Sequence, residues 1–89
     1  MEAGTMAGER LTVPERVIVS PAPGMFRPVT GEESGAGGIL VEEQVIGFVE
    51  GSGRSTPVRS PFRGFLMGMM AHAGERVREG QPVAWLRLA

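Results

Sequence analysis

The sequence contains no cysteine, lysine, aspartate, asparagine or tyrosine among its 89 residues. Without cysteine, a disulfide, a thiolate nucleophile and a cysteine zinc site are excluded, and the single histidine cannot build a histidine-rich metal centre. Without aspartate, a Ser-His-Asp triad cannot form. Without lysine, the chain offers no side chain for a Schiff base or for a lysine-attached cofactor. We therefore expect neither a metal ion nor a cofactor.

Charge and hydropathy exclude further classes of protein. Nine arginines balance ten glutamates to a net charge of −1, whereas a nucleic-acid-binding protein carries a basic stripe. The apolar stretches are too short to span a membrane. The N-terminus lacks the cationic and apolar regions of a secretory signal, so a cytoplasmic protein is expected.

Fourteen glycines and seven prolines separate apolar runs of four to eight residues. This spacing is typical of short strands joined by turns, and it predicts an all-β sandwich or barrel. Residues 1–12 contain little to bury and are predicted to be a flexible tail, followed by one domain over residues 13–89. The first strand is expected over Arg16 to Ser20.

The sequence repeats itself in two offset blocks. Residues 20–26 reappear forty positions later as residues 60–66, and residues 37–49 match residues 74–86 at an offset of thirty-seven. The change of offset places three extra residues within Arg27 to Gly38, which we interpret as an enlarged loop. Two halves of about forty residues, each too short to bury a sheet face alone, predict a pseudo-twofold β-structure.

The joint between the two halves is a segment rich in glycine and serine, residues 50–57. It follows an expected strand over Val45 to Glu50 and precedes another over Pro57 to Ser60. Closely spaced glycines supply the positive φ angles of a tight turn. We therefore expect an exposed hairpin at the joint.

Several motifs in this order resemble the biotinyl/lipoyl carrier domain family, and within it the biotin carboxyl carrier proteins of acetyl-CoA carboxylase. The resemblance covers about residues 16–88. It is carried by residues 20–26, 44–50 and 58–64, and best by the run from Gly74 to Val83, which is similar to a repeated turn of the family. The resemblance implies a flattened barrel of two four-stranded antiparallel sheets.

One departure from the family removes its chemistry. In the family, the glutamate that aligns with Glu50 is followed by Ala-Met-Lys-Met, whose lysine takes the biotin. Here these positions are Gly51, Ser52, Gly53 and Arg54, and the attachment lysine falls on Gly53. Serine has no amine, and the arginine guanidinium stays protonated and non-nucleophilic. We predict that this degenerate hairpin carries neither biotin nor lipoate.

A second departure lies in the apolar strand after Gly64. Phe65, Met69 and Ala71 match inward positions of the family, whereas Met67 and Met70 fall at or near outward ones. Methionine adapts to varied contact surfaces, so Met67 and Met70 either fill the core or form a surface for a partner or ligand.

Other residues have simpler interpretations. Trp85 and Phe48 occupy matching positions in the two halves, and we expect both in the core. His72, at a strand end, is expected to be a solvated turn residue. Arg54 lies where a cofactor would be attached, but an exposed turn arginine more often serves solubility than recognition.

Two functions follow from these features. The favoured one is a non-catalytic binding or scaffold subunit that docks a protein partner, such as a carboxylase-like or acyl-transfer assembly, or self-associates through its methionine-rich strand. The alternative is a cofactor-independent lyase or cyclase acting on an apolar small molecule. Its cleft, beside the hairpin, would be lined by Met67, Met70, Phe65 and Trp85. Acid, base or charge stabilisation would then come from Glu50, Arg54 or His72.

Overall fold

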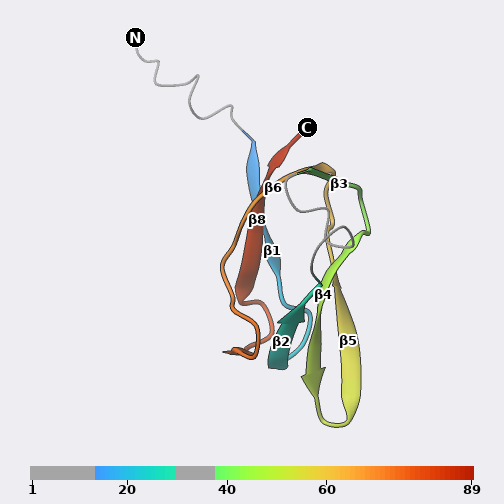
Figure 1. The fold of residues 1–89 in the computed structure, drawn as a ribbon, viewed down its shortest axis with the longest axis vertical. Coiled ribbons are helices and arrows are strands. Elements are labelled where there is room, and N and C mark those ends of the chain that lie inside the picture. The colour runs from blue at the N-terminus through green and yellow to red at the C-terminus, as the bar shows by residue number, and fades with distance from the viewer. Residues whose placement is uncertain (1–13, 30–37) are drawn as a thin grey trace.

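The computed structural model describes residues 14–29 and 38–89, and it contains eight strands and no helix within them (Figure 1). Glycine and proline interrupt the chain often enough to keep every strand at seven residues or fewer. In chain order, the strands are β1 (Glu15–Val19), β2 (Gly24–Pro28), β3 (Ile39–Leu40), β4 (Val45–Gly51), β5 (Arg54–Arg59), β6 (Gly64–Met69), β7 (Arg76–Val77) and β8 (Pro82–Leu88).

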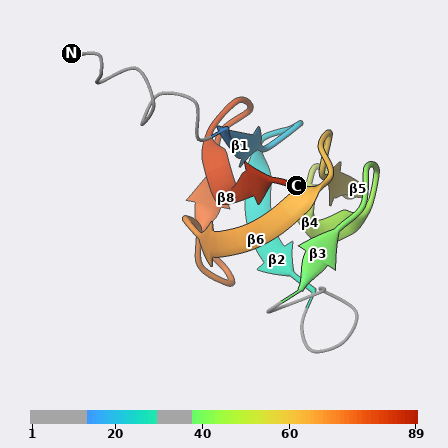
Figure 2. The same ribbon diagram turned by 90° about the horizontal axis from the view of Figure 1, so that it is seen from above.

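The strands form two four-stranded antiparallel sheets, which confirms the predicted fold class. Sheet A has the order β1-β8-β6-β3 and sheet B the order β5-β4-β2-β7. Adding four to the strand numbers of the first half and subtracting four from those of the second half converts one order into the other, as a pseudo-twofold axis requires. Figure 2, which looks along the long axis, shows the two sheets enclosing a common interior.

Several predicted strand boundaries differ from the structure: β1 ends at Val19 rather than Ser20, β4 at Gly51 rather than Glu50, and β5 at Arg59 rather than Ser60. The first strand begins at Glu15 rather than Arg16. Arg27 and Pro28, assigned to the enlarged loop, still pair with β4 as part of β2. β5 begins at Arg54 rather than Pro57, because the hairpin needs fewer turn residues than its composition suggests. The predicted tail over residues 1–12 and the middle of the predicted loop lie outside the described residues.

The core lies between the sheets and takes residues from both halves. Its members are aliphatic apart from one phenylalanine, and they comprise Ile18, Phe26, Leu40, Ile46, Val49, Val58, Ala71, Val77, Val83, Ala84 and Leu86. Trp85 and Phe48 are not among them, so the expectation of two core aromatics is wrong. Each is half-buried, because the register places it beside an outward neighbour of the edge strand, Val17 for Trp85 and Pro57 for Phe48.

Two buried serines mark equivalent points in the two halves. Ser20 and Ser60 are 1% and 0% exposed. Each hydroxyl donates to a backbone oxygen two residues ahead, that of Ala22 at 2.6 Å and that of Phe62 at 2.6 Å. The repeated Ser-Pro motif is therefore conserved between the halves of this chain as a hydrogen-bonded bend at the start of a turn.

The backbone at these serines joins one half to the other. The Ser20 amide donates to the Gln81 carbonyl at 2.8 Å, and the Ser60 amide donates to the Gln44 carbonyl at 2.8 Å. Ser20 and Gln81 belong to different halves, as do Ser60 and Gln44. The two halves thus hold each other through a matched pair of contacts.

Candidate functional site

The hairpin that joins the halves is the position where the family resemblance implies cofactor attachment. β4 and β5 remain paired up to Gly51 opposite Arg54, leaving a two-residue turn of Ser52 (φ 53°) and Gly53 (φ 72°). Positive φ at both central residues defines a type I′ turn, whose twist matches that of paired strands. A Cβ added at Gly53 would meet nothing within 4 Å. The predicted hairpin is thus tight, and its tip projects from one end of the molecule (Figure 1).

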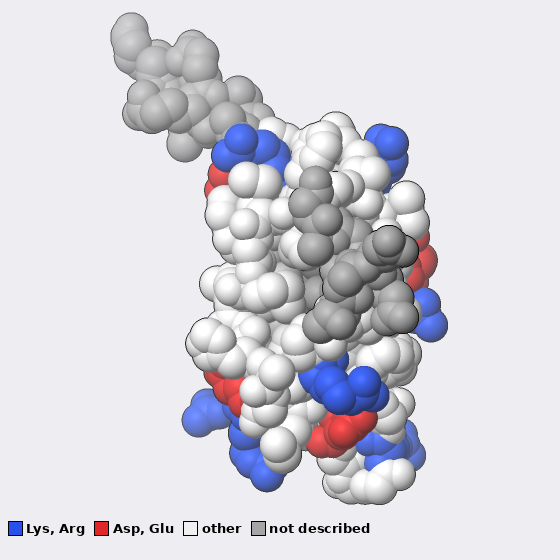
Figure 3. Space-filling view, in the orientation of Figure 1, with Lys and Arg blue, Asp and Glu red and all other residues white. Residues whose placement is uncertain are grey.

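Charged side chains surround the base of this hairpin. The Arg27 guanidinium lies 2.8 Å from a Glu50 carboxylate oxygen, and both side chains are about half exposed. Figure 3 shows charged residues gathered at this end of the molecule. A surface hollow of about 310 Å³ beside the tip is lined by Glu50, Gly51, Gly53, Arg54 and Ser55. Nothing in this set is an amine that could carry a cofactor.

The outward face of sheet A carries a continuous apolar surface. Val17 of β1 lies opposite Trp85 of β8. A bulge in β6 sets Met67 and Gly68 together against Trp85, and the indole nitrogen is so near that a Cβ at Gly68 would lie 3.0 Å from it. Phe65, two residues before Met67 on β6, extends this apolar surface. We call the set Val17, Phe65, Met67 and Trp85 the sheet A face.

The predicted orientations in β6 were partly wrong. Phe65 was assigned inward, but it lies opposite the exposed Arg87 and is itself 48% exposed. Met69 lies opposite the buried Ala84, yet it remains 43% exposed. Ala71 is buried as predicted, and the open question for Met67 and Met70 is resolved because both are exposed.

Sheet B provides an internal comparison for the sheet A face. Under the pseudo-twofold relation, Phe48 corresponds to Trp85 and Arg27 corresponds to Met67. The Arg27 guanidinium covers the Phe48 ring at 5.1 Å from its centroid while also pairing with Glu50. On sheet A, the residue that matches Arg27 by the forty-residue offset is the uncharged Met67, and the pairing partner of Trp85 is the adjacent Gly68. Equivalent positions beside the aromatic side chain therefore hold a charged residue on sheet B and an apolar residue on sheet A.

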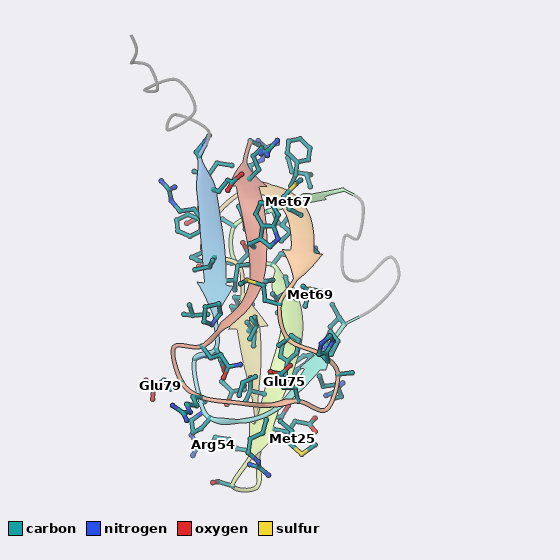
Figure 4. All side chains as sticks on the ribbon, turned by 90° about the vertical axis from the view of Figure 1, so that its left-hand side faces the viewer. Met25, Arg54, Met67, Met69, Glu75 and Glu79 are labelled. Atoms are coloured by element: carbon teal, nitrogen blue, oxygen red, sulfur yellow. The ribbon has the colours of Figure 1, made fainter. Side chains whose placement is uncertain are left out.

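The enzyme hypothesis places Met67 and Arg54 in one cleft beside the hairpin, but the structure does not bring these two residues together. Met67 lies on β6 toward one end of the molecule, whereas Arg54 lies at the hairpin end (Figure 4). The lining of the hollow beside the hairpin includes neither Met67 nor Met70. His72 is exposed, as expected, and its backbone amide donates a hydrogen bond to a carboxylate oxygen of Glu75 at 2.9 Å.

Sequence reasoning missed the role of Val17 and Trp85 as surface neighbours. A signal was present in the repeat itself, because the forty-residue offset aligns the charged Arg27 with the apolar Met67. Within residues 14–29 and 38–89, no three acidic or histidine side chains form a group that could hold a metal ion. No helix in these residues is long and apolar enough to cross a membrane.

The fold is an all-β domain of two four-stranded sheets built from two pseudo-symmetric halves. No family model matches the chain, and no curated protein matches it. Among solved structures, it is similar to urea carboxylase of Kluyveromyces lactis, with a TM-score of 0.69 and 19% identity over 81% of this chain. The match spans 6% of that carboxylase chain. At this identity the likeness shows the fold alone.

Proposed function

We propose that the chain is a degenerate carrier-like domain that takes neither biotin nor lipoate and acts as a non-catalytic binding or scaffold subunit. The observation that carries the proposal is the combination of an intact two-sheet architecture with a hairpin tip of Ser52 and Gly53. Covalent loading requires an amine at the tip, and the sequence has no lysine. The architecture then serves contact with other proteins.

The sheet A face is the proposed docking surface. Its charged neighbours, Glu15 and Arg87, lie 3.3 Å apart and neutralise each other, and Figure 3 shows an uncharged stretch on the left-hand side of the molecule, over β6 and β8. A neutral surface of this kind favours an apolar partner, because a charged one would lose hydration without gaining a counter-charge.

A hollow beside the tryptophan offers a place for an anchoring side chain of the partner. It holds about 420 Å³ and is lined by Glu15, Arg16, Val17 and Trp85. Interfaces concentrate their binding energy where an aromatic or aliphatic group fills such a pocket. The occupant we propose is an apolar side chain on a protein of a carboxylase-like or acyl-transfer assembly, in keeping with the fold's occurrence within a much longer carboxylase chain.

Site-specific photo-crosslinking tests this proposal. A photoreactive residue replaces Met67 in one variant and Met25 in the other; these side chains are 43% and 44% exposed, so accessibility is matched. Met25 lies on β2 of sheet B, near the hairpin end (Figure 4). We expect protein crosslinks from position 67 and few from position 25, with loss of the former when Phe65→Lys is added. Equal yields at both positions, or none at 67, would contradict a docking role for the sheet A face.

A further inference from the structure

Four strands of the described structure lie at sheet edges, and three of them are protected against pairing with another chain. β3 and β7 are two residues long each, and short edges give an incoming strand little to pair with. β5 carries Pro57 at its centre, which removes a backbone donor from the edge. β1 has five residues and no proline, and its Val17 and Val19 are 46% and 44% exposed.

The hydrogen-bond pattern shows which groups of β1 are open. The Leu88 amide donates to the Pro14 carbonyl at 2.8 Å, so Glu15 and the opposite Arg87 form a non-hydrogen-bonded pair. The alternation of an antiparallel ladder makes Val17 opposite Trp85 another such pair. The N–H and C=O of Val17 therefore point away from β8, toward a side on which the described residues place no strand.

The pseudo-twofold relation supplies a direct comparison at this position. Pro57 corresponds to Val17, and it lies opposite Phe48 as Val17 lies opposite Trp85. At Pro57 the outward-facing amide hydrogen is missing, whereas at Val17 it is present. Sheet B is thus closed to strand addition at the point where sheet A is open.

We infer that a second copy of this chain docks along β1, with the two β1 strands antiparallel and Val17 on the twofold axis. This inference builds on the proposed function, since it assigns one partner to the binding domain. In that register Val17 pairs with its own copy and Val19 pairs with Glu15, so that outward side chains stay on one continuous face. A contact of this kind is isologous, using the same strand of both copies.

Two features favour a copy of the same chain as occupant. The strand is complementary to itself in the register just described, with exposed valines brought together at the centre. The net charge of −1 also leaves little repulsion between copies, and proteins near zero net charge associate more readily. The area buried along one five-residue strand is small compared with the ~800 Å² that each partner buries in a standard complex. A contact of this size belongs with weak and transient interfaces, so we expect the copies to associate only at high chain concentration.

Sedimentation equilibrium of the full chain from about 10 µM to about 1 mM tests the inference. We expect a reversible monomer–dimer equilibrium that weakens at least about tenfold with Val17→Pro, which copies the proline of β5 into β1. Val17→Lys should weaken it similarly, because two like charges would meet on the axis. Met25→Lys is the control, since it adds the same charge at a side chain of nearly equal exposure on sheet B. Circular dichroism confirms that each variant is folded.

The outcomes separate this inference from the proposed function. A native chain that stays monomeric across the range overturns docking of a second copy, while crosslinking from position 67 to another protein would leave the binding role standing. A dimer that survives Val17→Pro but is lost with Phe65→Lys overturns the assignment to the β1 edge and places self-association on the sheet A face instead.

Discussion

Removing the hydroxyls of the two buried serines tests whether equivalent positions in the two halves contribute equally to the free energy of unfolding. Ser20→Ala and Ser60→Ala each delete a hydrogen bond of 2.6 Å from an almost fully buried side chain. A lost hydrogen bond that leaves a partly buried carbonyl unpaired costs about 1–2 kcal/mol. For a domain of this size, 1 kcal/mol lowers the melting temperature by about 4–8 °C. We therefore expect each variant to melt about 5–15 °C below the native chain.

The two losses should be nearly equal and additive. The serines occupy equivalent environments and share no hydrogen-bond partner, and independent sites add to within about 0.5 kcal/mol. Urea denaturation followed by the fluorescence of the single tryptophan measures the free energy of unfolding for both single variants and the double variant. A difference above about 1 kcal/mol between the single variants, or a coupling of that size in the double, would refute the reasoning.

Three further substitutions probe backbone geometry, and all three are read by the same urea titration. Gly64→Ala should cost about 2–3 kcal/mol, because the new Cβ would overlap the Arg87 carbonyl and lie 2.7 Å from Leu86 Cδ1. Gly53→Ala is the matched control. A Cβ at Gly53 meets no atom within 4 Å, so the substitution should cost only the strain of a positive φ, about 1 kcal/mol. Equal losses of stability for Gly64→Ala and Gly53→Ala would contradict the packing argument. Ser52→Asn should stabilise the chain by about 0.5 kcal/mol, because asparagine tolerates the left-handed conformation of a type I′ turn better than serine does, and a loss of stability would contradict that turn assignment.

The repeat carried most of the fold that could be predicted from the sequence. The offsets of forty and thirty-seven relate β1 and β2 to β5 and β6, and β3 and β4 to β7 and β8, as the sheet orders require. Such a relation is visible in sequence because both halves need the same bends, and residues such as Ser20 and Ser60 make them. Loop boundaries were less predictable, since Arg27 and Pro28 have turn-like composition but are held in β2 by pairing with β4.

The orientation of surface side chains could not be predicted from alternation alone. A bulge between Leu66 and Gly68 shifts the register of β6 against β8, and a shift of one residue exchanges the inward and outward sets. Trp85 is large and apolar, which suggested the core, but its position opposite Val17 is set by strand pairing. Pairing between strands, rather than alternation along one strand, therefore places Val17 and Met67 beside Trp85.

The proposed function rests on a two-sheet architecture that lacks the amine that covalent loading requires. Intact-mass measurement tests it most directly, after incubation with biotin, ATP and a biotin ligase. The compared chains are the native one and a variant carrying Ser52→Met, Gly53→Lys and Arg54→Met, which restores the tip expected from the family resemblance. We expect the native chain to keep its mass and the folded variant to gain one biotin. Biotin on the native chain, or a folded variant that is never modified, would contradict the account.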